Sequence, residues 1–87
     1  MQLDPADMTS VINRIKRAQG QLAGVLRMLE QGRECEDVVT QLAAVSKALD
    51  RAGFAIVATG LQHCLTNGDE IGSVDVKKME KLFLSLA

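Results

Sequence analysis

Two long runs of regularly spaced apolar residues constrain the fold of this chain more than any other feature. In the first run, apolar or small residues recur at steps of three and four: Met8, Val11, Ile15, Ala18, Leu22, Val25 and Leu29. The second run keeps this spacing at Cys35, Val38, Leu42, Val45, Leu49, Ala52 and Ile56. Such spacing is typical of α-helices that pack along a seam, so the sequence predicts two long amphipathic helices.

Residues that favour helix ends and turns divide the chain into three expected helices. Asp4 is suited to cap the first helix, and Gly32 is suited to end it. The turn sequence Asn67-Gly68-Asp69 then precedes Ser73, which can cap a short last helix. The expected helices span about residues 5–31, 35–66 and 74–86.

The composition favours a single all-α domain over residues 1–87. Hydrophobic residues make up 47% of the chain but aromatic residues only 2%, so aliphatic side chains must supply the core. The sequence does not show the short, evenly spaced strands of an all-β protein. A chain of 87 residues buries only a modest core alone, and association into oligomers is one common remedy.

The second expected helix carries the two cysteines of the chain, Cys35 and Cys64, at its ends. If Gly53 and Gly60 do not break this helix, the two sulfurs lie roughly 40 Å apart along its axis. An antiparallel copy of the helix would bring Cys35 of one protomer near Cys64 of the other. The apolar stretch that follows Gly53 also needs cover on all sides, which again favours a second protomer.

The residues alone leave the chemistry of these thiols open. A cysteine without a disulfide is commonly a small buried hydrophobe, but a pair of thiols can also hold a soft ion such as Cu(I), form a disulfide or carry added sulfur. His63 adjoins Cys64 but points about 100° away from it on a helix, so we do not expect them to share an ion. The four ligands of a tetrahedral zinc site are not found at suitable spacing.

The distribution of charge is more informative than the net charge of −1. Between Met8 and Leu29 the charged residues are all basic: Arg14, Lys16, Arg17 and Arg27. Arg14 and Arg17 share one helix face, and Lys47 and Arg51 share a face of the second helix. These residues form either a solvated surface or a set of phosphate contacts. No helix-turn-helix, zinc finger or aromatic stacking strip decides between the two interpretations.

The sequence lacks the features of secreted, membrane and enzymatic proteins. The N-terminus has no basic start followed by an apolar run, and no apolar run reaches the ~18 residues that span a bilayer. No Ser/His/Asp set and no glycine-rich phosphate loop indicates an enzyme. We therefore expect a cytoplasmic protein that is not an enzyme, uses no cofactor and does not enter a membrane.

Two motifs give the chain a specific resemblance. They are R-I-x-x-x-x-G-Q-x-x-G, which starts at Arg14, and C-x-D-V-x-x-Q, which starts at Cys35. With these motifs the chain resembles the copper-sensitive operon repressor family over nearly its whole length. The resemblance implies an all-α homotetramer, a dimer of dimers in which each dimer is an antiparallel four-helix bundle. It also implies a repressor that releases double-stranded operator DNA when a cysteine site between subunits is modified or metallated.

The residues at the cysteine site distinguish the inducers of that family. Copper sensors have a histidine where this chain has Gly60, nickel and cobalt sensors use more histidines, and formaldehyde sensors pair an N-terminal proline with the first cysteine. The persulfide-sensing sulfurtransferase repressors keep only the two cysteines, and this chain resembles them most. The resemblance thus implies that low-molecular-weight persulfides link Cys35 and Cys64 of different protomers through a di-, tri- or tetrasulfide.

The same resemblance assigns DNA contact to Arg14 and Arg51, with Arg17 and Lys47 in support. One alternative is a Cu(I)-responsive repressor that uses the two thiols as metal ligands, and a metal is expected only in that case. Another is a helical oligomerisation module that binds no DNA. A thiol redox enzyme is disfavoured because the chain has no C-x-x-C motif.

Overall fold

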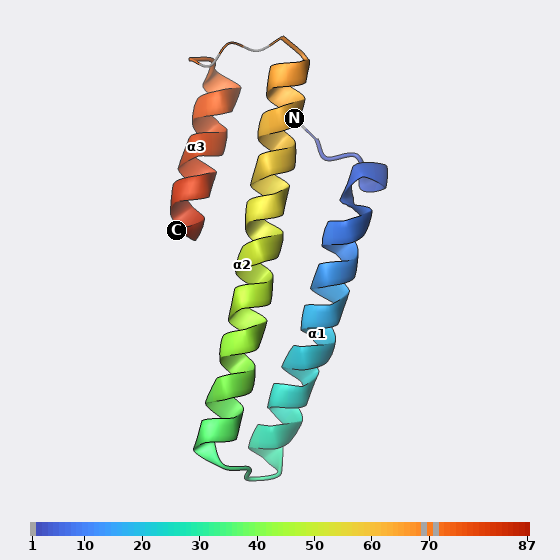
Figure 1. Cartoon of the computed structure of the whole chain (residues 1–87), viewed down its shortest axis with the longest axis vertical. Coiled ribbons are helices and arrows are strands. Elements are labelled where there is room, and N and C mark those ends of the chain that lie inside the picture. The colour runs from blue at the N-terminus through green and yellow to red at the C-terminus, as the bar shows by residue number, and fades with distance from the viewer. Residues whose placement is uncertain (1, 69, 71) are drawn as a thin grey trace.

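The computed structural model describes residues 2–68, 70 and 72–87, and these form helices and turns without a strand. A 3₁₀ turn, η1 (Pro5–Met8), leads into α1 (Thr9–Glu30), and α2 (Cys35–Thr66) and α3 (Val74–Leu86) follow. Figure 1 shows α1 and α2 as a hairpin, with α3 folded back along the C-terminal half of α2. The all-α expectation is confirmed, whereas the four-helix-bundle dimer and the dimer of dimers stay predictions.

The three helices lie in a single layer. The molecule measures 53 × 25 × 13 Å along its principal axes, so its thickness is close to the diameter of one helix, about 10–12 Å with side chains. One layer of helices cannot enclose side chains on both of its faces. Much of the apolar surface therefore stays exposed in the single chain.

Side-chain caps mark the starts of η1 and α3. Asp4 accepts a hydrogen bond from Ala6 N at 3.0 Å, and Ser73 Oγ accepts one from Val76 N at 3.2 Å. The backbone after Asp4 is wound more tightly than expected, because Asp7 N donates to Asp4 O at 2.9 Å. The helix expected from about residue 5 consequently opens as the 3₁₀ turn η1 and becomes α-helical only afterwards.

Two glycines with positive φ end the long helices. Gly32 has a φ of 67°, and its N–H donates to Leu29 O at 3.2 Å. Gly68 has a φ of 86°, and its N–H donates to Leu65 O, also at 3.2 Å. Side chains with a Cβ rarely adopt this backbone conformation, which explains why glycine stands at both ends. Asp69, the last residue of the expected turn, lies outside the described residues.

From Val11 onward, buried positions alternate with more exposed ones in the two expected seams, and Met8 at the start of the first seam is buried as well. The buried positions are Val11, Ala18 and Val25 of α1 and Val38, Val45 and Ala52 of α2. The seam leucines between them, Leu22, Leu29, Leu42 and Leu49, are 44% to 62% exposed. Half of each seam thus joins α1 to α2, and the other half forms an apolar strip on the surface of the hairpin.

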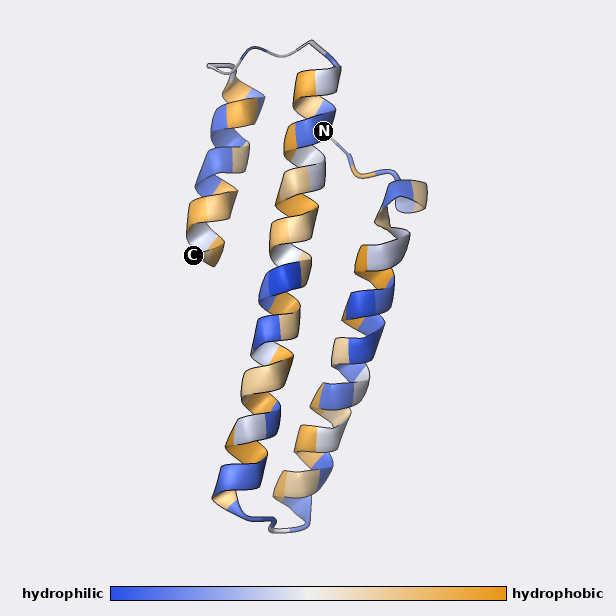
Figure 2. Ribbon diagram, viewed as in Figure 1, coloured by the Kyte–Doolittle hydropathy of each residue, from blue (hydrophilic) through white to orange (hydrophobic). Residues whose placement is uncertain are grey.

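The helix α2 runs unbroken through Gly53 and Gly60. A Cβ at Gly53 would lie 3.0 Å from Leu86 Cδ1, so the missing side chain lets the end of α3 approach closely. Next to it, the rings of Phe54 and Phe83 pack with centroids 5.2 Å apart. In Figure 2 the C-terminal half of α2 is mostly apolar and faces α3. The chain's own α3 therefore supplies part of the cover that we expected from a second protomer.

Candidate functional site

The two cysteines occupy opposite ends of α2. Cys35 is its first residue and is exposed, whereas Cys64 lies in its last turn and is 2% exposed. Because the helix is unbroken, their separation along the axis is roughly 40 Å, as the spacing predicted. The two thiols therefore do not meet within one chain, and their pairing across protomers stays a prediction.

Both thiols nevertheless leave α2 on nearly the same side. They are about eight helical turns apart, so their Cβ atoms point in similar directions. Gly60 lies one turn before Cys64 on this side and is also buried. The position that holds a histidine in copper sensors by the family resemblance thus offers no side-chain donor here.

His63 lies on a different side of α2 from Cys64. It is exposed, and its Nε2 is 2.9 Å from Asn67 Nδ2. It lines a polar hollow of about 590 Å³ between the N-terminal segment and the end of α2, together with Gln2, Leu3, Asp4, Asp7, Thr59, Gln62 and Thr66. The two side chains leave α2 about 100° apart, so we do not expect His63 and Cys64 to bind one ion.

A single chain does not assemble a metal site from its described residues. Across 2–68, 70 and 72–87, no three His, Cys, Asp or Glu side chains are grouped so that they could hold an ion. Among the titratable side chains, the two thiols fit a soft metal best, and a thiolate pair suits Cu(I) better than harder ions. A metal at these cysteines therefore requires sulfur from two protomers.

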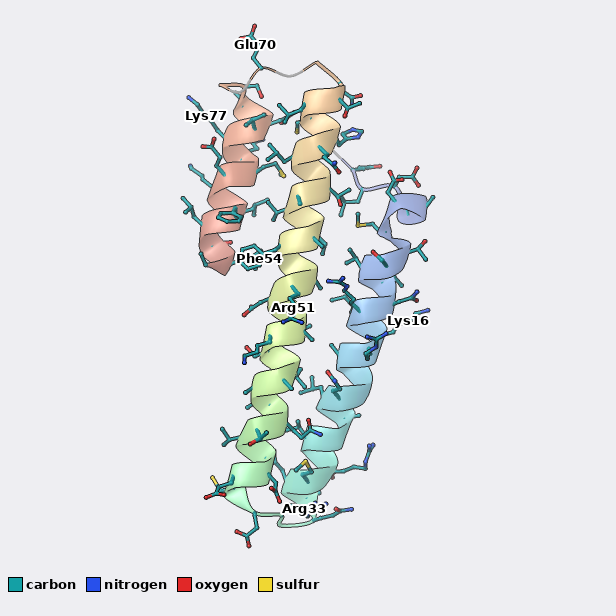
Figure 3. All side chains as sticks on the ribbon, viewed as in Figure 1. Lys16, Arg33, Arg51, Phe54, Glu70 and Lys77 are labelled. Carbon is teal, nitrogen blue, oxygen red and sulfur yellow. The ribbon has the colours of Figure 1, made fainter. Side chains whose placement is uncertain are left out.

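A basic pocket brings together three of the four residues predicted to contact DNA. Arg14 and Arg17 of α1 and Arg51 of α2 line it with Ala48, and its volume is about 230 Å³. Figure 3 shows Arg51 midway along α2. None of the three guanidinium groups has an ion pair or a hydrogen bond to another described residue. Three uncompensated cations that converge on one hollow favour an anionic ligand such as phosphate.

Ala48 lines the pocket, although the charge pattern does not indicate it, and Lys47 does not, although the charge pattern indicates it. Ala48 lies one turn before Arg51, and its small side chain leaves room between the guanidinium groups. Lys47 is exposed on α2 but does not line the pocket. Small size at a position that faces another helix is the only sequence signal for Ala48, and it depends on knowing how α1 packs on α2.

Within the part of the chain that the structure describes, no helix is both long enough and apolar enough to cross a membrane.

Known proteins show a clear relationship. A 45-residue segment, 52% of the chain, is 53% identical to 71% of the uncharacterised protein YrkD of Bacillus subtilis. Copper-sensing transcriptional repressor RicR of Mycobacterium tuberculosis is 40% identical over 61% of the chain and 55% of its own length. Copper-sensing transcriptional repressor CsoR of Mycobacterium ulcerans is 40% identical over 66% of the chain and 49% of its own length.

The chain thus spans about half the length of the copper-sensing relatives that it matches. Residues 7–85 match the family model of metal-sensitive transcriptional repressors. This match confirms the family that the two motifs indicated, without distinguishing its persulfide-sensing branch. The family consists of transcriptional regulators and not of enzymes. The chain belongs to the family of metal-sensitive transcriptional repressors.

Proposed function

We propose that residues 1–87 act as one repressor domain that binds operator DNA in the cytoplasm. The basic pocket of Arg14, Arg17 and Arg51 carries this proposal, because it presents three uncompensated guanidinium groups from two helices. Such groups bind phosphate oxygens in bidentate fashion. Lys47 adds charge beside the pocket. The affinity should be strongly salt-dependent, because phosphate contacts release counterions.

The repressor would assemble as an antiparallel four-helix-bundle dimer and then as a dimer of dimers. The support is the apolar strip on the hairpin, which includes Leu42 and Leu49 of α2, 47% and 44% exposed in the single chain. A two-fold axis near Leu49 and Asp50 would place Cys35 of one protomer beside Cys64 of the other. The sensor site would then contain one exposed and one buried thiol from different chains.

Cu(I) is the first candidate inducer. RicR and CsoR are copper-sensing repressors, and this favours copper over the persulfides that the two-cysteine pattern indicated. Thiolates are soft ligands that suit Cu(I). Gly60 supplies no nitrogen ligand, so the site would hold the ion between Cys35 of one protomer and Cys64 of its neighbour.

A low-molecular-weight persulfide is the second candidate, and the buried Gly60 favours it. One thiolate would attack the sulfane sulfur of the persulfide, the sulfur–sulfur bond would break, and the low-molecular-weight thiolate would leave. The thiolate of the second protomer would then attack the inner sulfur of the new cysteine persulfide. This step releases hydrosulfide and leaves a disulfide between Cys35 and Cys64, while two cysteine persulfides would combine into a trisulfide and release hydrogen sulfide.

Either inducer would act by changing how the two protomers are placed. The basic pocket is shared between α1 and α2, and the cysteines lie at both ends of α2. A bond or an ion that draws Cys35 of one chain toward Cys64 of the next would shift the α2 helices against each other. The pockets of the assembly would then no longer match the spacing of phosphates along the DNA.

A titration of the DNA complex separates these proposals. The reduced protein bound to operator DNA should be titrated anaerobically with Cu(I) and, separately, with glutathione persulfide, while DNA release is followed by fluorescence anisotropy. We expect release by copper at one equivalent per site, and both Cys35→Ser and Cys64→Ser should abolish it. Release by persulfide alone would favour the second candidate. A protein that binds no DNA at low salt would contradict the repressor proposal and favour an oligomerisation module.

A further inference from the structure

We propose that α3 is a displaceable cover over Cys64, so that this thiol reacts only after α3 has moved away from the C-terminal half of α2. The cover itself follows from the geometry of the chain. Its regulatory meaning rests on the proposed function, because it concerns a thiol of the proposed sensor site. Cys35 and Cys64 then differ in accessibility, although both are thiols on the same helix.

The burial of Cys64 is not a property of its side of α2. Cys35 and Cys64 leave the helix in nearly the same direction, because they are about eight turns apart. Cys35 is nevertheless exposed, and Cys64 is 2% exposed. Their surroundings therefore differ, and α3 is the helix that lies along the C-terminal half of α2 and not along its N-terminal half (Figure 1).

The side of α2 that faces α3 can be followed residue by residue. Gly53 lies on it, since a Cβ there would be 3.0 Å from Leu86 Cδ1. Val57, Gly60 and Cys64 follow at steps of four, three and four, so they share this side. All three are buried. The residues of α2 that pack on α1 form a separate series, Val38, Val45 and Ala52.

The contact that holds α3 in place is small. Within the described part of α3, Val76 is its only buried residue. Val74 and Leu84 are each 69% exposed, and Leu82 and Phe83 are 49% exposed. An isolated helix of 13 residues is marginal in water, so α3 depends on this docking for its order. Segments with few buried apolar contacts open at a small fraction of the free energy of global unfolding.

A cover of this kind links the thiol to the position of α3. A reagent that needs the Cys64 sulfur reacts only with the open form. Its observed rate is therefore proportional to the small fraction of molecules in that form. A ligand that holds the sulfur in the open form shifts the equilibrium toward it. The inducer and the docked α3 therefore compete, and weaker docking makes the sensor more sensitive.

The test measures how fast each thiol is alkylated, without DNA or inducer. The full chain should be treated with N-ethylmaleimide, and the two cysteines quantified separately by peptide mass spectrometry. We expect Cys64 to react at least about tenfold more slowly than Cys35. Phe83→Ala, which removes the ring packed on Phe54, should accelerate Cys64 about tenfold and leave Cys35 unchanged. Leu84→Ala, at a 69% exposed position of the same helix, is the matched control and should change neither rate.

A second variant keeps the test decisive if Phe83→Ala does not fold. Gly53→Ala places a methyl group 3.0 Å from Leu86 Cδ1, which is tighter than an ordinary contact, and should also accelerate Cys64, with the far-UV circular dichroism of α1 and α2 retained. Equal rates at both thiols of the native chain would overturn the proposal. So would a slow Cys64 that neither variant accelerates, because a different segment or a partner chain would then be the cover. A chain that binds no DNA can still give the expected rates, so failure of the repressor function is distinguishable from failure of the cover.

Discussion

The two halves of α2 differ in what covers them. The N-terminal half packs on α1 along Val38 and Val45 and leaves its thiol, Cys35, in solvent. The C-terminal half also lies under α3, and its thiol is almost fully buried. One helix with one repeating pattern thus presents two cysteines in opposite environments. The contrast follows the placement of α3, which lies beside the half of α2 that holds Cys64 and not beside the half that holds Cys35 (Figure 1).

The largest effects should come from placing a charged side chain at a buried position in each half of α2. Val45→Asp buries a carboxylate against α1 at a 2% exposed position and should destabilise the hairpin by roughly 3 kcal/mol or more. Val57→Asp should release α3 and preserve the α1–α2 hairpin. Amide hydrogen exchange distinguishes the two, because the first variant loses protection throughout and the second only in α3. Global loss of protection in both variants would mean that the halves are not independent.

The proposed DNA contact lies where the two halves of α2 meet. The second largest effect should be the loss of DNA affinity in Arg51→Ala. We expect at least about tenfold lower affinity for DNA at low salt, with the slope of log K against log salt reduced by about one. Lys47→Ala removes the same charge outside the pocket and should have a smaller effect. Fluorescence anisotropy at several salt concentrations measures both. Equal losses would show that charge alone, and not the pocket, binds DNA.

A smaller effect should follow when the pocket is filled without any change in charge. Ala48→Leu places a larger side chain between the three guanidinium groups and should reduce DNA affinity severalfold. The thermal midpoint should change little, because the added atoms enter open space. Ala44→Leu, one turn earlier at an exposed position, serves as the control. Unchanged DNA affinity in Ala48→Leu would place the phosphate outside the pocket.

The smallest expected effect is a difference in stability between two substitutions, Gly20→Ala and Gly53→Ala. A Cβ at Gly20 of α1 meets no atom within 4 Å, so Gly20→Ala should stabilise the helix by about 0.5–1 kcal/mol. Gly53→Ala gains the same helix propensity but contacts Leu86, so we expect no net gain. Thermal melts should show a rise of a few degrees for the first variant only. A similar rise for Gly53→Ala would show that α3 yields without cost.

Local interactions explain which parts of the fold were predictable. The start of α3 and the turn at Gly32 lie where Ser73 and the glycine indicated them, because these residues act on hydrogen bonds within one turn. The first helix start differs by a few residues, since a 3₁₀ turn competes with an α-helical one after Asp4. Periodicity placed Arg14 and Arg17 on one helix face, and the family resemblance added Arg51, but neither indicated Ala48 between them.

The sequence by itself determined that the chain is helical, where its long helices end and that its two thiols cannot meet within one protomer. Those properties depend on the rise and periodicity of a helix and on caps that act over a few residues. Only the tertiary structure decided which seam residues are buried, which small residue completes the basic pocket and which cysteine is covered. These properties depend on contacts between helices that are distant in the chain, as the contact of Leu86 with Gly53 shows.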